Sequence, residues 1–171
     1  MAQTRFLPEV VERDRKQNEF SKTIWDYLDK AVSEDRIAAG QRALRKNAAL
    51  FDRIEARYRV DKYTVLAIWG LESAYGAVRG DIDTLSALAT LSYEGRRAEF
   101  FEAELLILLK ILQRGAAKPG QLRGSWAGAM GHTQFMPSSY ERLAVDFNGD
   151  GSRNIWDDDP TDALASTAAY L

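Results

Sequence analysis

Apolar residues recur every three or four positions along most of the chain, which is the spacing of amphipathic α-helices. The charge-dense segment 7–20 predicts a weakly determined surface helix, and Ser21 is placed to cap the next segment. Apolar positions within 24–31 predict a helix there, and a longer amphipathic pattern covers 37–58. Asp61 then stands where a helix cap is expected.

The middle of the chain predicts two strongly apolar helices, over 84–91 and 98–113. A polar break at 92–97 separates them, and Gly115 and Pro119 stop the second. No segment shows the sustained alternation of apolar and polar residues that is typical of a strand. The fold class is therefore predicted to be mainly α.

One helix is expected to be buried on nearly all sides. Between residues 63 and 75 the only charged residue is Glu72, and helical spacing places it on one face with Val65, Ile68 and Trp69. A buried carboxylate without a partner has a raised pKa, which suits a general acid. The alternative is a glutamate paired with an arginine or reaching water at the helix end.

Composition and charge mainly exclude certain kinds of partner and site. The 171 residues form one domain of ordinary size, and the sequence allows truncation at one or both ends, because its last helix reaches Leu171 without a capping signal. A net charge of −2 does not favour nucleic acid, and the absence of cysteine excludes disulfides, thiolate metal sites and cysteine nucleophiles. No signal peptide is visible, and the apolar run at 105–112 is too short to span a bilayer.

Segment 124–140 gathers glycine, serine, methionine and aromatic residues in one irregular stretch. Glycines permit close backbone approach by a ligand, and aromatic rings beside polar groups suit the apolar face of a sugar. The alternative is a tight loop whose aromatic side chains fill the core. His132 is the only histidine in the sequence, which excludes a cluster of histidine metal ligands.

Segment 146–157 matches the twelve-residue calcium loop of an EF-hand. It has oxygen ligands at positions 1, 3 and 5, glycine at 6, a main-chain carbonyl at 7 and an acidic residue at 12. The predicted ligands of a single structural Ca²⁺ are Asp146, Asn148, Asp150, Ser152 and Asp157. The alternative is an Asx-rich turn without an ion, and a single loop argues against a paired calcium sensor.

Several of these motifs occur in one order, at 67–76, 85–97, 124–140, 145–157 and 162–171. With them the sequence resembles the B-type family of bacterial lytic murein transglycosylases. The resemblance covers nearly the whole chain. It implies a lysozyme-like α-helical catalytic domain with an EF-hand-like calcium loop, and cleavage of the β-1,4 bond between N-acetylmuramic acid and N-acetylglucosamine in peptidoglycan.

The resemblance also assigns roles to individual positions. Glu72 matches the catalytic acid/base, and segment 146–157 matches the calcium site. The expected substrate-binding residues are Ser73, Tyr75, Ser125, Gln134 and Tyr170. Two positions depart from the family pattern, since His132 stands where tyrosine is usual and Ala169 where asparagine is usual.

A lytic transglycosylase needs one carboxylate, whereas ordinary glycoside hydrolysis uses two. Other carboxylates, at Asp81, Asp83 and Glu94, lie in polar loops and are expected to be solvated or structural. Three alternatives stay open: a hydrolytic muramidase, a catalytically silent peptidoglycan-binding domain and a calcium-responsive regulator. We expect a monomer that binds glycan strands and needs no organic cofactor; the family implies the periplasm of a Gram-negative bacterium.

Overall fold

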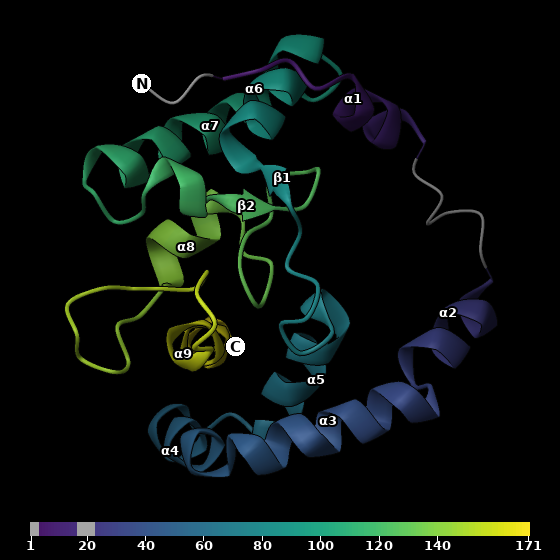
Figure 1. The fold of residues 1–171 in the computed structure, drawn as a ribbon, viewed down its shortest axis with the longest axis vertical. Coiled ribbons are helices and arrows are strands. Elements are labelled where there is room, and N and C mark those ends of the chain that lie inside the picture. The colour runs from purple at the N-terminus through teal and green to yellow at the C-terminus, as the bar shows by residue number, and fades with distance from the viewer. Residues whose placement is uncertain (1–3, 17–22) are drawn as a thin grey trace.

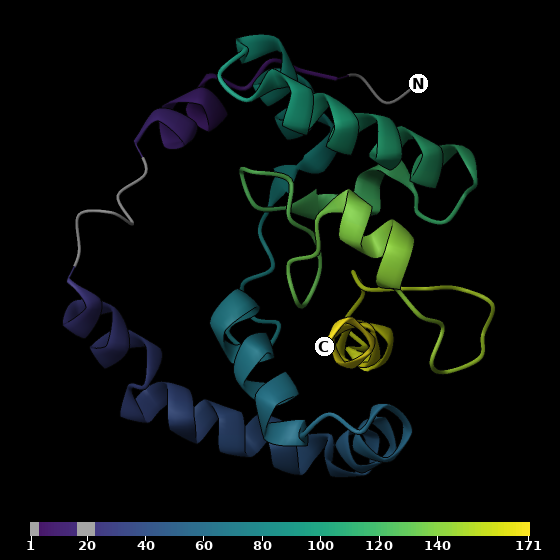
Figure 2. The same cartoon turned by 180° about the vertical axis from the view of Figure 1, so that it is seen from behind.

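The computed structural model describes residues 4–16 and 23–171, and the prediction of a mainly α fold is confirmed (Figures 1 and 2). The helices are α1 (Pro8–Arg15), α2 (Ile24–Ala31), α3 (Glu34–Lys46), α4 (Ala48–Tyr58), α5 (Lys62–Ser73), α6 (Thr84–Glu94), α7 (Ala98–Gln113), α8 (Pro137–Leu143) and α9 (Thr161–Tyr170), with a 3-10 turn at Pro119–Gln121. Within the described residues no helix is long and apolar enough to cross a membrane.

The N-terminal half differs from prediction in two places. Ser21 lies outside the described residues, and Thr23 caps α2 through a reciprocal capping box with Asp26. The pattern at 37–58 predicted one helix, which is wrong. Asn47 leaves helical geometry there, and its side chain donates to the Ala43 carbonyl at 2.9 Å, which ends α3 before α4 begins.

The helix pair α6 and α7 follows the prediction closely, although α6 continues to Glu94 and ends at Gly95 (φ 95°). Two strands were not predicted: β1 (Ile82–Asp83) pairs antiparallel with β2 (Arg123–Gly124). A two-residue strand shows no detectable alternation, so only the pairing of distant segments reveals it.

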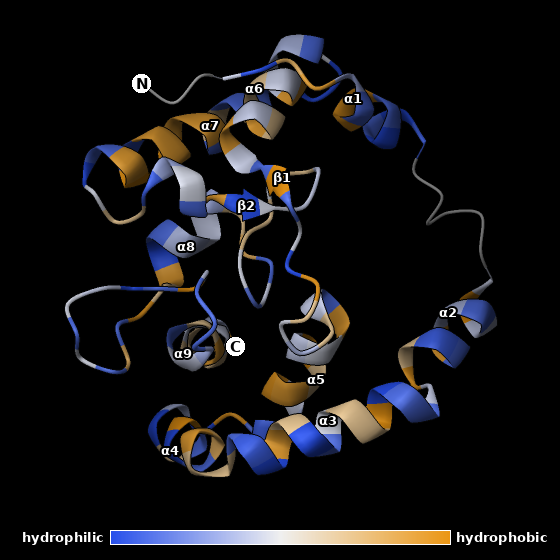
Figure 3. Cartoon of the chain, in the orientation of Figure 1, coloured by the Kyte–Doolittle hydropathy of each residue, from blue (hydrophilic) through white to orange (hydrophobic). Residues whose placement is uncertain are grey.

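A first hydrophobic cluster joins α1, α6, α7 and α8 with the irregular segment before α8. Its fully buried side chains include Leu88, Leu108, Ile111, Met130 and Tyr140. Figure 3 shows α7 as mostly apolar along its length, whereas the loop between α8 and α9 is mainly polar. This cluster holds the Gly-rich segment in place.

A second hydrophobic cluster lies where α4, α5 and α9 meet, with α3 packed beside them (Figure 1). It contains Phe51, Ile54, Val65, Trp69 and Leu164. The helix that carries Glu72 is therefore held by a different cluster from the segment that carries Ser125.

Candidate active site

Glu72 occupies the last turn of α5. Asp61 caps the start of this helix, as predicted, by accepting a hydrogen bond from the Thr64 amide at 2.9 Å. The helix ends abruptly, because Ala74 (φ 50°) and Tyr75 (φ 59°) both adopt the left-handed region. Such backbone geometry costs about 1 kcal/mol or more per non-glycine residue and tends to occur at functional sites.

The prediction that α5 is buried on nearly all sides is wrong. Val65 and Trp69 are buried, but Leu71 is 47% exposed, and Glu72 also reaches the surface. The helix packs against α3, α4 and α9, while Ala67, Leu71 and Glu72 remain exposed. Glu72 thus lies at the edge of the apolar face.

The Glu72 carboxyl group reaches solvent, yet the surrounding protein desolvates it and raises its pKa above the ordinary value. Within the described chain no hydrogen bond or ion pair reaches this carboxylate. Nothing nearby therefore stabilises the ionised form. The group is set up to carry a proton at a higher pH than an ordinary glutamate does.

Ser73 was expected to contact substrate, and the structure gives it a different place. Its side chain is buried, donates to the main-chain carbonyl of His132 at 2.5 Å and accepts from the Gly76 amide at 3.0 Å. Tyr75 is half-buried and uses its hydroxyl to bind the Arg36 carbonyl at 3.0 Å. Both side chains support residues 72–76, the Glu72 turn.

Ser125 begins the tight turn of the Gly-rich segment. Its hydroxyl oxygen accepts from the amides of Ala127 at 3.3 Å and Ala129 at 3.1 Å, while its own amide donates to the Ala129 carbonyl. The chain returns at Gly128 (φ 90°), where a side chain would collide with Leu88. The Ser125 hydroxyl hydrogen is still free to bind a ligand.

The turn after α5 packs directly on the Gly-rich segment. Gln134 donates its amide hydrogens to the carbonyls of Arg79 at 3.0 Å and Gly131 at 2.9 Å, so its carbonyl oxygen alone is left for a ligand. Gly80 lies so close to this segment that a Cβ there would be 2.1 Å from the Gly124 oxygen. These contacts join the Glu72 turn to the segment that carries Ser125.

Tyr170 lies at the C-terminal end of α9 and is 58% exposed. Its ring packs on Phe135 of the Gly-rich segment, with the centroids 6.2 Å apart. An exposed ring supported from below offers a flat apolar surface of the kind that packs on sugars.

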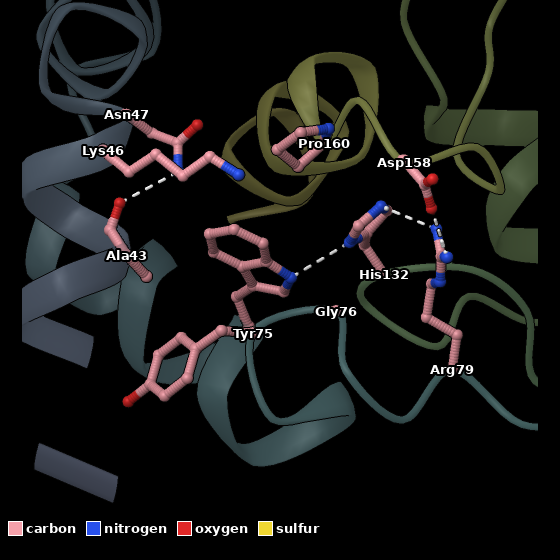
Figure 4. Close-up of a pocket in the computed structure, with 10 residues that line it drawn as sticks. Ala43, Lys46, Asn47, Tyr75, Gly76, Arg79, His132, Asp158 and Pro160 are labelled. Carbon is pink, nitrogen blue, oxygen red and sulfur yellow. Dashed lines mark hydrogen bonds and ion pairs between the residues drawn. The ribbon is translucent and has the colours of Figure 1, made fainter. Parts of the chain in front are cut away.

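A cavity of about 170 Å³ lies behind the Glu72 turn, between α3, the loop after α5 and the start of α9 (Figure 4). Trp69, Tyr75 and His132 line its inner wall, and Asp158 and Arg79 form an ion pair at 2.6 Å at one side. Glu72 does not line this cavity. The residues that line it support the turn after Glu72. Ser125, Gln134 and Tyr170, which are expected to contact the glycan, are not among them.

The segment 146–157 forms a loop that turns at glycines and carries several oxygen atoms able to bind a metal ion. Asp146 accepts main-chain hydrogen bonds from Gly149, Asp150 and Gly151, and both glycines have positive φ. The loop thus closes around Asp146, with Asn148 next to it. Among residues 4–16 and 23–171, no three acidic, histidine or cysteine side chains form a ready metal site, so a cation here would depend on mixed oxygen ligands.

Asp157, the predicted last ligand, turns toward other partners: its oxygens accept from Asn154 at 2.7 Å and Gln121 at 3.4 Å. Asp162 instead reaches into the loop. Its two oxygens accept from the amides of Phe147 at 2.8 Å and Asn154 at 2.9 Å. Burial raises the pKa of Asp162, and the nearby charge of Asp146 raises it further.

Residues 1–171 match the family described as Transglycosylase SLT domain. The chain belongs to this family. It is 41% identical over 146 residues to the membrane-bound lytic murein transglycosylase B of Escherichia coli (strain K12), and the match covers 85% of this chain and 40% of that protein. The family suggested by the sequence motifs is confirmed.

Solved structures of the transglycosylase family are similar over nearly all of this chain. SltB3 of Pseudomonas aeruginosa in complex with NAG-NAM-pentapeptide is 50% identical with a TM-score of 0.94, covering 99% of this chain and 45% of that one. Slt35 of E. coli in complex with calcium is 38% identical with a TM-score of 0.87, covering 98% of this chain and 53% of that one. The chain spans about half the length of these relatives.

Within this family member, sequence reasoning missed two residues that support the site. Asp162 lies five residues beyond the twelve-residue loop pattern, and the only signal that could have indicated it is an acidic residue shortly after a calcium-like loop. Arg79 lies in the loop after α5, where it donates to the carbonyls of Trp156 and Asp157 and pairs with Asp158. A contact between residues 77 or more positions apart leaves no local signal in the sequence.

Proposed function

We propose that this chain is the catalytic domain of a lytic transglycosylase that cleaves the β-1,4 bond between N-acetylmuramic acid and N-acetylglucosamine in peptidoglycan. The observation that carries the proposal is Glu72: one carboxyl group with a raised pKa and no protein partner, in a member of the transglycosylase family. Its relative SltB3 has been solved with muropeptide ligands, one of them containing anhydro-NAM.

Glu72 serves first as the acid and then as the base. Its proton passes to the glycosidic oxygen as the bond from that oxygen to the muramoyl anomeric carbon breaks, and the bonding electrons leave with the oxygen. The Glu72 carboxylate then removes the proton from the C6 hydroxyl of the same muramoyl residue. That oxygen bonds to the anomeric carbon and gives the 1,6-anhydro product. The substrate supplies the nucleophile, so proximity replaces a second protein carboxylate.

Two of the other carboxylates considered from the sequence, Asp83 and Glu94, have structural partners, which supports a single-carboxylate mechanism. Asp83 caps α6 by accepting from the Ser86 amide at 2.7 Å, and Glu94 pairs with Arg15 at 2.7 Å, which lowers the pKa of Glu94. The expectation that these two groups are structural or solvated agrees with their contacts. Neither is left as an unpaired nucleophile.

The glycan is proposed to lie against the side of the molecule that presents Ser125, Gln134 and Tyr170. Ser125 offers a hydroxyl donor and Gln134 a carbonyl acceptor, which match the hydroxyl and acetamido groups of the sugars. Tyr170 offers a supported aromatic face. Polar groups of both kinds beside an aromatic ring are what an amino-sugar polymer requires.

The loop at 146–157 is proposed to hold one structural Ca²⁺, as the calcium complex of the relative Slt35 suggests. Its donors are all oxygen, which this hard cation prefers. Asp146, Asn148, Asp150 and the Ser152 carbonyl would hold it, and Asp162 is a better placed final carboxylate than Asp157. Each Asp162 oxygen that accepts an amide keeps a second lone pair for a cation. The ion would stabilise the loop.

The proposed location is the cell envelope, where peptidoglycan is found. The E. coli relative is named as membrane-bound, which supports an envelope protein. We propose glycan strands as the binding partner and a monomer as the working state.

Mass spectrometry of soluble muropeptides released from purified peptidoglycan tests the proposal, with Glu72→Gln as the control. The expected result is anhydro-muramoyl ends that vanish in the variant. Reducing ends, which are heavier by one water, would show a hydrolytic muramidase instead. Binding to peptidoglycan without release by the wild-type chain would show a silent glycan-binding domain.

A further inference from the structure

His132 is only 3% exposed, and its two ring nitrogens, its main-chain amide and its main-chain carbonyl all have hydrogen-bond partners. Two partners belong to α5: the Trp69 indole donates to Nδ1 at 3.2 Å, and the Ser73 hydroxyl donates to the main-chain carbonyl at 2.5 Å. The other two lie at the end of the calcium-like loop, where the His132 amide donates to the Ile155 carbonyl at 3.1 Å and Nε2 bonds to the Asp157 carbonyl at 2.7 Å. The residue bridges these two elements.

The partners fix which ring nitrogen carries the proton. An indole N–H can only donate, so Nδ1 of His132 has to be the acceptor (Figure 4). A main-chain carbonyl can only accept, so Nε2 of His132 carries the hydrogen toward Asp157. The imidazole is therefore neutral and in a single tautomer. The adjacent Arg79 guanidinium, 3.2 Å from Nε2, opposes a positive charge on the ring.

The ring has almost no room to move. A Cβ at Gly76 would lie 2.6 Å from both Nδ1 and Cε1 of His132, so the imidazole rests directly on the Gly76 backbone. The ring also packs edge-on against Trp69, with ring centroids 5.7 Å apart. Glycine at 76 is what allows this approach.

The two α5 partners of His132 lie on either side of Glu72, three residues before it and one residue after it. The end of a helix is normally its least constrained part, because its last carbonyls lack helical partners. Here the next two residues are strained, which gives the last turn an additional reason to loosen. We propose that His132 is a positioning residue, which fixes the Glu72 turn against segment 155–157 through its hydrogen bond with Trp69.

This inference rests on the proposed acid role of Glu72 and adds a residue that never touches the substrate. A carboxylic acid has to meet the glycosidic oxygen at hydrogen-bond distance, and a misplacement of about 1 Å can cost roughly 100-fold in rate. Supporting hydrogen bonds that lock such a group are therefore expected to affect turnover more than substrate affinity.

Three variants separate the two imidazole contacts. In His132→Asn the side-chain oxygen replaces Nδ1 and can accept from Trp69, but the contact to Asp157 is lost. In His132→Gln the amide nitrogen replaces Nε2 and can donate to Asp157, but the Trp69 indole loses its acceptor. His132→Leu removes both contacts at similar volume.

The measurement is the rate of anhydro-muropeptide release against the concentration of soluble glycan strands, with the melting temperature of each variant. Positioning predicts that His132→Gln and His132→Leu lose roughly tenfold or more in kcat at nearly constant KM. His132→Asn should recover most of that loss. Wild-type kcat in His132→Gln, or equal losses in His132→Asn and His132→Leu, would overturn the inference.

A second readout does not depend on catalysis. The pKa of Glu72 can be followed by NMR of its side-chain carboxyl carbon, and we expect it to fall toward the ordinary glutamate value in His132→Gln but not in His132→Asn, because a loosened turn becomes better hydrated. An unchanged pKa in His132→Gln would contradict the positioning role. A wild-type chain that releases no product would count against the proposed function alone, and this titration would still decide the role of His132.

Discussion

Arg96 forms two hydrogen bonds to the carboxylate of Asp14, from Nε at 2.5 Å and from one terminal nitrogen at 2.6 Å, and Asp14 is only 1% exposed. The pair attaches α1 to the turn between α6 and α7. Its bidentate geometry is the strong form of an ion pair. The nearby pair of Arg15 with Glu94 joins the same two segments, but here the arginine side chain is 65% exposed and that of Glu94 is 11% exposed.

Arg96→Ala is expected to lower the melting temperature clearly, because it leaves the Asp14 carboxylate buried without its partner. Arg15→Ala is the matched control and should have a smaller effect, since the Arg15 side chain is mostly in solvent and Glu94 keeps its hydrogen bond from the Arg96 amide. Thermal unfolding of both variants, with hydrogen exchange at 8–15, measures the difference. Equal shifts in the two variants would contradict it.

Glu104 of α7 caps the start of α8. Its carboxylate accepts from the amide of Ser138 at 2.9 Å and from the Ser138 hydroxyl at 2.6 Å, and Glu104 is 5% exposed. Glu104→Ala should destabilise the protein by roughly 2 kcal/mol, since the two partly buried donors of Ser138 lose their acceptor. Glu102→Ala, on the exposed side of the same helix, is expected to stay within about 0.5 kcal/mol. Chemical denaturation gives both values.

Gly76→Ala is expected to do more than strain the backbone. Gly76 (φ 85°) and Gly115 (φ 69°) are both left-handed, but only the Cβ at 76 meets His132, and nothing lies within 4 Å at 115. Gly115→Ala should therefore cost about 1–2 kcal/mol and leave turnover unchanged. Gly76→Ala should be less stable and lower kcat. A normal kcat in folded Gly76→Ala would show that the imidazole can shift harmlessly.

Glu72→Gln is expected to abolish cleavage without destabilising the fold. Because the pKa of Glu72 is raised on folding, its contribution to stability is complete below the unfolded pKa and declines as pH rises through the folded one. Glutamine carries no charge, so the variant should melt at or above the wild-type temperature near pH 7. The two proteins should converge below about pH 4. A lower melting temperature of the variant at neutral pH would contradict the raised pKa.

Calcium is expected to raise the melting temperature of the chelator-treated protein. At a calcium concentration of 100 times Kd, the free energy of unfolding should increase by about 2.7 kcal/mol. Asp146→Asn should remove this shift. The comparison of Asp162→Asn with Asp157→Asn identifies the last ligand, and we expect the former to weaken the shift more. A larger effect of Asp157→Asn would instead support Asp157 as the last ligand, as the twelve-residue pattern in the sequence predicts.

Elements with local signals could be predicted from the sequence. Helix α7 keeps its predicted bounds because its apolar pattern is continuous, and Asp61 caps α5 because a cap needs only neighbouring residues. The short helix α8 was missed. Seven residues carry little periodicity, and the start of this helix is capped by Glu104 from another helix.

The raised pKa of Glu72 could be predicted from the sequence, but the burial of the residues around it could not. A single glutamate among apolar residues indicated Glu72, and its raised pKa agrees with that reasoning. Which neighbour faces the substrate depends on how the helix packs, so Ser73 could not be placed inside the protein from spacing alone. Asp162 lay beyond the span of the loop pattern, and only the folded chain returns it to Phe147.

Glu72 is held by the hydrophobic cluster that contains Trp69, whereas Ser125 and Gln134 belong to the segment held by the cluster that contains Phe135. Tyr170 lies on α9, which packs with α5. A substitution deep in either cluster would therefore displace half of the proposed glycan site as a unit and leave the internal geometry of each half intact. Compensating substitutions need not lie near the chemistry. A change in one interior can be offset by a change in the opposite interior that restores the relative orientation of the two halves, so genetic suppressors of weak core variants are expected far from Glu72.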